Sequence, residues 1–291
     1  MAQTRDEERL ANAPIGPLML KLAVPAVAAQ VINMLYNIVD RIYIGHIPEV
    51  GDIALTGVGV TFPIIMLISA FAAFAGQGGA PLASIQLGAG KREKAEKILG
   101  NSLTLLLIAA VALTVGFSIF KEPILYAFGA SENTIGYAMD YIGIYLIGTI
   151  FVQLALGLNT FISAQGKALV AMLSVLIGAV LNICLDPVFI FGLHMGVKGA
   201  ALATILSQAV SAAWVVGFLC SRRSGLRIRK KNMRLEPKVV GRVAGLGVAP
   251  FIMQSTESLV TVVLNTGMQT YGGDLYVGST EWLEHLEISE K

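Results

Sequence analysis

Long apolar stretches recur along this chain, and they constrain its fold more than any other feature. About 20 apolar residues in a helix span the hydrocarbon core of a bilayer, and windows of that length repeat throughout the sequence. Only 14% of the residues are charged and the mean hydropathy is +0.71, whereas soluble domains carry roughly 25% charged residues. The sequence therefore predicts an all-α integral membrane protein. The expected spans cover residues 18–45, 53–80, 98–120, 137–164, 168–192, 197–219 and 243–268.

Basic residues gather in alternate connections between these spans. Of the 21 Lys and Arg, 17 lie before or at the start of the first span, or in the connections after the second, fourth and sixth. The positive-inside rule then predicts a multi-pass protein of the cell (inner) membrane, with the N-terminus cytoplasmic and the C-terminus outside. Nine basic residues fall in 222–242, which we interpret as a cytoplasmic linker rather than a surface for nucleic acid or anionic lipid.

A faint internal repeat suggests how the spans are grouped. LAVPAVAAQ at 22–30 resembles LGVAPFIMQ at 246–254, with Leu, Val and Gln matching at a constant offset of 224. Transporters are commonly built from repeated halves, so we expect a six-helix N-terminal lobe plus the first helix of a second, missing repeat lobe. The expected divisions are 1–17 (cytoplasmic N-terminus), 18–220 (N-lobe of six helices), 221–242 (basic linker), 243–272 (seventh helix) and 273–291 (outer turn and acidic tail).

The last residues differ in character from the rest. TEWLEHLEISEK carries glutamates at a helical spacing of three, and no eighth apolar span follows. We interpret 280–291 as a foreign, frame-shifted or engineered end after a truncation, with a native amphipathic helix as the alternative. The N-terminal residues lack the features of a cleaved signal peptide.

Two aspartates inside the spans are candidates for chemistry, because a carboxylate in a bilayer is costly and usually functional. Asp40 lies four residues after Tyr36, and Asp186 lies four residues after Asn182, so each shares a helix face with a polar partner. Asp140 is discounted because it lies at the outer start of the fourth span, where water can reach it.

Further polar groups in the spans extend this constellation. Asn159 and Thr204 supply intramembrane oxygens, and Glu257 is a third candidate for ion coupling because it lies mid-span. Carboxylates with neutral oxygens suit a hard cation such as Na⁺, while buried carboxylates can instead exchange protons. Pro187 can free a backbone oxygen beside Asp186, and Pro25 is a candidate hinge in the first span.

Two functions use the same aspartates. In an ion-coupled transporter, cation or proton binding at Asp40 and Asp186 biases alternating access; in a membrane-embedded aspartyl hydrolase they form a dyad that shares one proton. The YD and GxGD motifs of intramembrane aspartyl proteases are absent, since Val39 and Leu185 precede the two aspartates. The repeat and the intramembrane amides favour transport, so no enzyme activity, resident cofactor or resident metal is expected. A non-functional fragment is the third alternative.

Four segments resemble the multidrug and toxic compound extrusion (MATE) family: YNIVDRIYIGH (36–46), GQGGAPLASIQLGAGKREKAEKILGN (76–101), LNTFISAQGK (158–167) and LNICLDPVFIFG (181–192). The resemblance covers about 15–278. It implies a twelve-helix transporter of two lobes that exports small organic, often cationic, compounds in exchange for Na⁺ or H⁺, as a monomeric unit without nucleic acid.

The resemblance also implies roles for residues of this chain. The N-lobe ion site of the family falls on Asp40, Asn182, Asp186 and Thr204, with Tyr36 and Asn159 in the surrounding polar network, Pro25 at the bend of the first helix and Glu257 at a cation-binding position. Helices 8–12 of the family have no counterpart in these 291 residues. We therefore expect that this chain alone does not drive drug efflux, and the sequence names neither the substrate nor the coupling ion.

Overall fold

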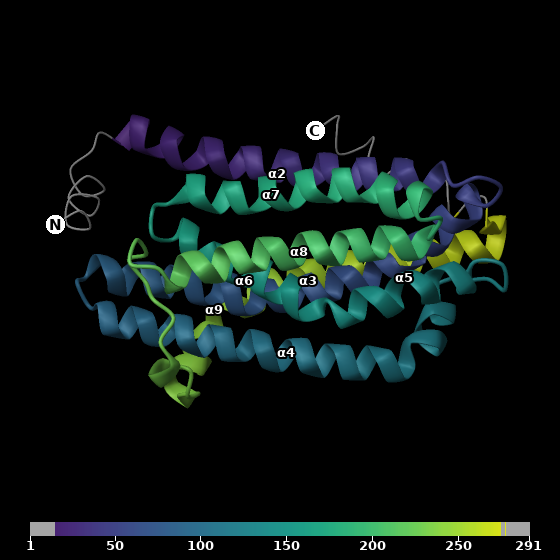
Figure 1. Cartoon of the computed structure of the whole chain (residues 1–291). Coiled ribbons are helices and arrows are strands. Elements are labelled where there is room, and N and C mark those ends of the chain that lie inside the picture. The colour runs from purple at the N-terminus through teal and green to yellow at the C-terminus, as the bar shows by residue number, and fades with distance from the viewer. Residues whose placement is uncertain (1–14, 275–276, 278–291) are drawn as a thin grey trace.

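Helices running back and forth across one bundle account for nearly all of the part of the chain that the structure describes, residues 15–274 and 277 (Figure 1). This structure is a computed structural model. It contains no strand within those residues, which confirms the predicted all-α class. The helices are α2 (Ile15–Gly45), α3 (Gly51–Gly88), α4 (Arg92–Ala127), α5 (Ile135–Ile147), α6 (Thr149–Ser163), α7 (Ala168–Pro187), α8 (Val197–Cys220) and α9 (Pro237–Gly272), with a π-helical turn η1 (Val188–Gly192) and a 3₁₀ turn η2 (Lys230–Asn232).

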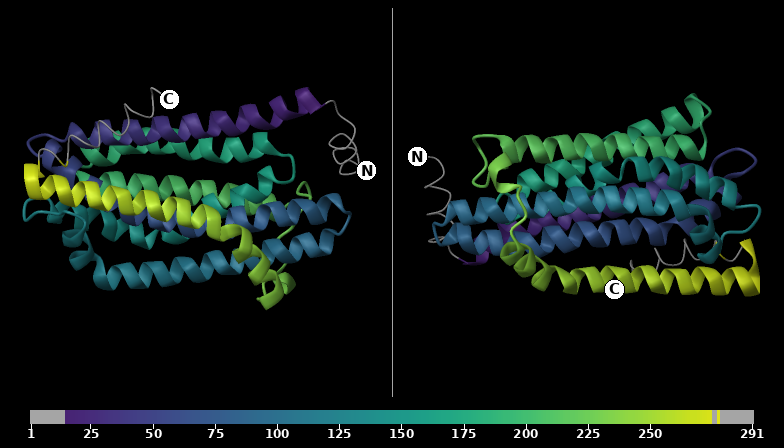
Figure 2. Two further views of the ribbon diagram at one scale, coloured as in Figure 1. Left: turned by 180° about the vertical axis from the view of Figure 1, so that it is seen from behind. Right: turned by 90° about the horizontal axis from the view of Figure 1, so that it is seen from below.

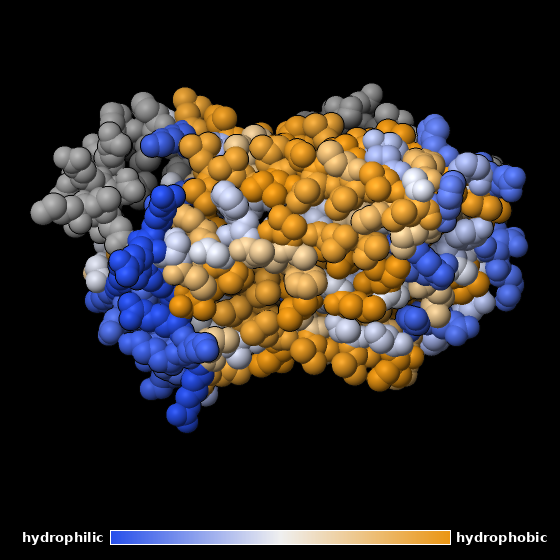
Figure 3. Space-filling model, viewed as in Figure 1, coloured by the Kyte–Doolittle hydropathy of each residue, from blue (hydrophilic) through white to orange (hydrophobic). Residues whose placement is uncertain are grey.

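Six of these helices are long and apolar enough to cross a membrane. The pair α5 and α6 passes the same test as one span bent by 60°, giving up to seven spans within the described residues. On the face that Figure 3 shows, apolar side chains form a broad belt across the middle of the bundle, and the strongly hydrophilic ones gather at its two ends. This pattern is that of a protein whose solvent is lipid around the middle and water at both ends.

The bend in the fourth span was not predicted, because hydropathy averaged over residues 137–164 does not show a change in helix direction. It lies at Gly148, between α5 and α6. A Cβ atom at Gly148 would collide with the side chain of Ile205 in α8. The absence of a side chain therefore lets Ile205 of α8 pack directly against the bend.

The helix α3 lies at the centre of the bundle, and its small residues allow the neighbouring helices to approach it closely. A Cβ atom at Gly76 would lie 2.6 Å from the carbonyl oxygen of Gly157 in α6, and one at Gly79 would lie 2.7 Å from the ring of Phe161. Membrane helices commonly associate through such small residues. The GQGG segment of α3 thus explains why α3 packs tightly on α4, α6 and α9.

The seventh span, α9, lies along one face of the bundle against α3 and α4 (Figure 2). It begins at Pro237, six residues before the predicted span, because a proline is well accommodated in the first turn of a helix. Near its other end, Asp274 accepts hydrogen bonds from Gln269 and Asn133. Partial burial raises the pKa of Asp274, but hydrogen bonds from Ser131, Gln269 and Asn133 outweigh burial and leave that pKa below its usual range.

The two ends of the bundle differ in charge. We call "the basic end" the one that holds the α3–α4 connection, the α6–α7 connection and residues 221–236. The opposite end holds the α2–α3 turn, the α4–α5 loop, η1 and the end of α9. The glutamates of the predicted acidic tail, Glu281, Glu284, Glu287 and Glu290, lie outside the described residues.

Candidate polar site between the second, seventh and eighth helices

Two carboxyl groups from distant parts of the chain meet between α2 and α7. Asp40 and Asp186 lie within hydrogen-bonding reach of each other. Their side chains are almost completely buried, with residue exposures of 8% and 0%. The meeting follows from the packing of α2 along α7, which the view in Figure 1 also shows. The structure therefore brings together the two aspartates that the sequence singled out.

Asn182 and Thr204 complete this group. The Asn182 side-chain amide donates to Asp186 Oδ1 at 3.1 Å and lies 3.4 Å from the hydroxyl oxygen of Thr204 in α8. Both residues are buried. We call Asp40, Asn182, Asp186 and Thr204 the polar cluster; it draws on three helices, and its four members are those expected at the ion site.

The chain changes its helical geometry directly after the cluster. Pro187 ends α7, and the backbone continues as the π-helical turn η1. A proline has no amide hydrogen and cannot donate to the preceding turn, and π-helical turns occur frequently at functional sites. The sequence predicted a disturbed hydrogen-bond pattern beside Asp186 but not the π-helical turn.

A small cavity of about 40 Å³ adjoins the polar cluster. Its volume accommodates roughly two to three water molecules, which is far below the roughly 300 Å³ of a typical drug-sized site. Polar side chains from α2, α6, α7 and α8 line much of it. They are Asn33, Tyr36, Asn159, Ser174, Asn182, Thr204, Ser207, Gln208 and Ser211.

Tyr36 and Asn159 lie on the cavity wall rather than in the cluster. Tyr36 is within hydrogen-bonding reach of Gln208 in α8. Asn159 donates to the carbonyl oxygen of Ala171 at 3.3 Å and accepts from the Ser174 hydroxyl at 3.2 Å. Asn159 thus joins α6 to α7, and among the described residues no contact links it to either aspartate.

Sequence reasoning missed most of the α8 contribution. Ser207, Gln208 and Ser211 line the cavity beside Thr204. Their positions, three, four and seven residues after Thr204, place all four on one helix face. That polar stripe in an otherwise apolar span was the sequence feature that could have identified these residues. Tyr141 of α5 also belongs to the site, because it lies within hydrogen-bonding reach of Thr204, but no pattern in the sequence pointed to it.

Two predicted residues lie elsewhere. Glu257 is exposed on α9, which packs on α3 and α4 and not on the helices that hold the cluster. Its role in cation binding therefore stays a prediction. Pro25 is buried within α2, and α2 continues through it as a single helix; its role as a hinge also stays a prediction.

The donor atoms of the cluster suit a hard cation or a shared proton. Asp40 Oδ1, Asn182 Oδ1 and Asp186 Oδ2 are buried and have no hydrogen-bond partner among the described residues. Buried polar atoms are normally satisfied, so these three oxygens mark a place for a bound group. Carboxylate and amide oxygens are the ligands of hard cations, and two adjacent carboxyls can also share a proton. No group of three or more His, Cys, Asp or Glu residues that could hold a metal ion gathers in the described part.

Ionisable groups buried in a helical membrane protein beside a polar cavity commonly mark ion and substrate pathways, which is the arrangement of membrane transport proteins. The profile of the MatE family matches residues 25–188, more than half of the chain. The chain belongs to this family, which is the one that its motifs resemble.

Relatives with known structures and names agree with this assignment. The MATE multidrug transporter DinF-BH superposes with a TM-score of 0.91 at 36% identity, over 97% of this chain and 63% of that chain. The multidrug export protein MepA of Staphylococcus haemolyticus is 28% identical over 254 residues, 87% of this chain and 56% of the relative. An FAD transporter of Shewanella oneidensis is 28% identical over 211 residues, 71% of this chain and 46% of the relative. The chain thus spans about half the length of these curated relatives.

Proposed function

We propose that this chain forms the N-terminal lobe of a cation-coupled exporter of small organic, often cationic, molecules, with the polar cluster as its coupling site for Na⁺ or H⁺. The observation that carries the proposal is the buried pair Asp40 and Asp186, with unpartnered oxygens beside a polar cavity. The names of the relatives, multidrug export proteins among them, support the substrate class.

Coupling would follow from the position of the pair between two helices. Two buried carboxylates repel each other unless a cation or proton neutralises them. Binding at the cluster would therefore favour close packing of α2 on α7, and release would favour their separation. An ion that binds one arrangement better shifts the population toward it, which is what an antiporter requires.

The export cycle itself is proposed for a protein that also contains the remaining length of the relatives. In such a protein the exposed face of α9 that carries Glu257 would contact further protein, since a carboxylate at that depth is not tolerated against lipid. We place the protein in the cell membrane with the basic end in the cytoplasm, on the strength of the uneven distribution of Lys and Arg.

A hydrolytic dyad would use the same two aspartates. Membership of a transporter family supports transport over hydrolysis, and the cavity beside the pair is far smaller than a peptide requires.

Ion binding can be tested on the chain as it stands. The purified chain is heated in detergent at constant ionic strength with NaCl or choline chloride, and its unfolding midpoint is recorded. A free-ion concentration of ten times Kd adds about 1.4 kcal/mol to the unfolding free energy. If Na⁺ is the coupling ion, NaCl raises the midpoint of the unaltered chain but not that of Asp40→Asn or Asp186→Asn. If H⁺ is the ion, the unaltered chain takes up more protons than either variant when titrated from pH 8 to pH 5.

Asp140→Asn is the matched control. Asp140 pairs with Lys198 at 3.4 Å and its side chain is 46% exposed, so this variant is expected to behave like the unaltered chain in both assays. A chain with neither a Na⁺ effect nor a difference in proton uptake from the two cluster variants would refute the coupling site.

A further inference from the structure

The linker between α8 and α9 is held in place on α4 rather than hanging loosely between two spans. Asn101 Nδ2 lies 3.4 Å from the carbonyl oxygen of Asn232, and Asn101 Oδ1 accepts from the Glu236 backbone at 2.7 Å. Thr104 donates to the carbonyl oxygen of Met233 at 2.6 Å. Residues 232–236 are therefore fixed along the third and fourth turns of α4.

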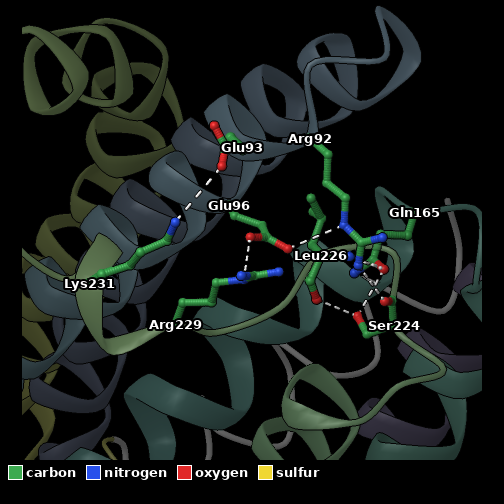
Figure 4. Close-up of polar contacts among 8 residues, drawn as sticks. All are labelled: Arg92, Glu93, Glu96, Gln165, Ser224, Leu226, Arg229 and Lys231. Atoms are coloured by element: carbon green, nitrogen blue, oxygen red, sulfur yellow. Dashed lines mark hydrogen bonds and ion pairs between the residues drawn. The ribbon is translucent and has the colours of Figure 1, made fainter.

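A second set of contacts fixes the earlier part of the linker (Figure 4). Glu96, which is 2% exposed, accepts from Arg92 at 3.2 Å and from Arg229 at 2.7 Å. The side-chain oxygen of Gln165 accepts from the Ser224 hydroxyl and the Leu226 backbone, each at 3.0 Å. The linker is thus attached to both α4 and the end of α6.

These contacts use few of the basic side chains of this segment. Arg229 pairs with Glu96, and Lys231 lies 3.8 Å from Glu93. Six others are exposed and form no ion pair within the part of the chain that the structure describes. They are Arg222, Arg223, Lys230, Arg234, Lys238 and Arg242. The linker therefore presents a fixed, uncompensated positive surface, which we call the basic surface.

The exposed residues along α9 indicate where the basic surface lies relative to the membrane. Lys238, Arg242 and Leu246 follow one another at intervals of four, so they share one face of α9, and all three are exposed. Each step of four residues advances the helix by about 6 Å. That face passes from two cations to an exposed leucine within about 12 Å, which is the transition from lipid headgroups to hydrocarbon. The hydrophilic end in Figure 3 adjoins the apolar belt in the same way.

We propose that the basic surface binds the phosphate headgroups of anionic phospholipids at the basic end of the bundle, a role that the sequence alone did not favour over that of a simple linker. Clusters of Lys and Arg beside a membrane helix attract anionic lipids. Here the linker is already ordered by Glu96, Asn101 and Gln165, so binding does not have to order the backbone. A soluble polyanion would meet the same charges but would gain nothing from the neighbouring apolar face of α9. This surface is independent of the polar cluster and does not require ion coupling.

Quenching of tryptophan by brominated lipids tests the proposal. Trp214 is 41% exposed on α8, six residues before the helix ends and the linker begins. Trp282→Phe leaves Trp214 as the only tryptophan. The chain is reconstituted into phosphatidylcholine bilayers, and quenching by dibromo-phosphatidylglycerol is compared with quenching by dibromo-phosphatidylcholine. Each Lys or Arg near the surface contributes about fivefold to the binding of anionic lipid, so we expect at least a threefold preference for phosphatidylglycerol in low salt.

Four comparisons make this result specific. Changing the six basic residues to Gln is expected to bring the preference to about one, whereas exchanging each Arg for Lys and each Lys for Arg keeps it. Lys121→Gln with Lys198→Gln, at the opposite end, leaves it unchanged. Raising NaCl to about 0.5 M weakens the preference in the unaltered sequence, because exposed charges are screened; this arm holds even if the Gln variant fails to fold.

Three outcomes would overturn the proposal. The first is equal quenching by both lipids in low salt, and the second is a preference that survives the six Gln substitutions. The third is loss of the preference when a short oligonucleotide is added at a concentration equal to that of the anionic lipid, since this would show that the surface prefers a soluble polyanion.

Discussion

The closest approach between α3 and α9 depends on two residues without side chains. A Cβ atom at Gly247 would collide with the carbonyl oxygen of Phe74, and one at Gly78 would lie 2.9 Å from the Gly247 Cα atom. Both neighbours are backbone atoms, so no rotation of a side chain can relieve the contact. The position of α9 on the bundle is thus set by single atoms at these two sites.

Gly247→Ala is therefore expected to destabilise the chain. Forcing a methyl group into a packed contact costs about 1–3 kcal/mol, although alanine is the better helix former by about 1 kcal/mol. The measurement is the unfolding midpoint in detergent, which should fall by several degrees. Gly245→Ala is the matched control, since nothing lies within 4 Å of a Cβ atom there; its midpoint should stay or rise. Equal midpoints for both variants would show that α9 does not pack on α3 as described.

Single residues also show what can be read from the sequence. Asp40 and Asp186 stood out because carboxylates are rare in apolar spans, and Asn182 because it shares a face with Asp186. Gln208 lies on the cavity wall, but an uncharged polar side chain in a span is common enough to carry little information. The placement of Glu257 on an exposed face depends on which neighbour α9 packs against, and a single helix does not encode that.

At the scale of elements, the contacts between the linker and α4 make the α8–α9 connection an integral part of the folded structure. Its hydrogen bonds run between residues about 130 positions apart in the chain. Periodicity reports only local structure, so the sequence predicted a basic linker and not its attachment. The bend at Gly148 was missed for a related reason, because the side chain that packs against it, Ile205, belongs to another helix.

Asn101→Ala should release the linker. The substitution removes two hydrogen bonds of the Asn101 side chain. One is accepted from the Glu236 backbone N–H, and the other is donated to the carbonyl oxygen of Asn232. Each lost hydrogen bond costs about 1 kcal/mol, so the open population should rise roughly five- to thirtyfold. The linker is rich in Arg and Lys, and limited digestion with trypsin reports its opening, because cleavage follows the open population when opening is fast.

The control for this experiment lies on the same helix. Thr114 donates to the carbonyl oxygen of Leu146 at 2.9 Å, so Thr114→Val removes one hydrogen bond of α4 far from the linker. Cleavage between Arg222 and Lys238 should be unchanged in this variant. Linker cleavage that is equally fast in Asn101→Ala and the unaltered chain would mean that the segment is not held by Asn101.

At the scale of the whole molecule, the sequence predicted the spans well because burial in lipid demands long apolar helices and little else. The helices extend past the predicted spans, as α3 does to Gly88 and α4 does from Arg92. Those extra turns lie at the ends of the bundle. There polar residues continue the helix, and the hydropathy of the sequence does not reveal the additional turns. The charge pattern is a property of the same scale, since it depends on all connections together.

The orientation that we propose from that charge pattern can be measured with two thiols. Cys220 ends α8 at the basic end and is exposed, and Glu132→Cys would place an exposed thiol at the opposite end. With Cys184 changed to Ser, a membrane-impermeant maleimide applied to intact cells should label Glu132→Cys and spare Cys220, because basic connections stay in the cytoplasm. Opening the membrane with detergent should expose both sites and controls for reactivity. Labelling of Cys220 in intact cells would show that the orientation is the opposite of the proposed one, with the basic surface facing the outer leaflet.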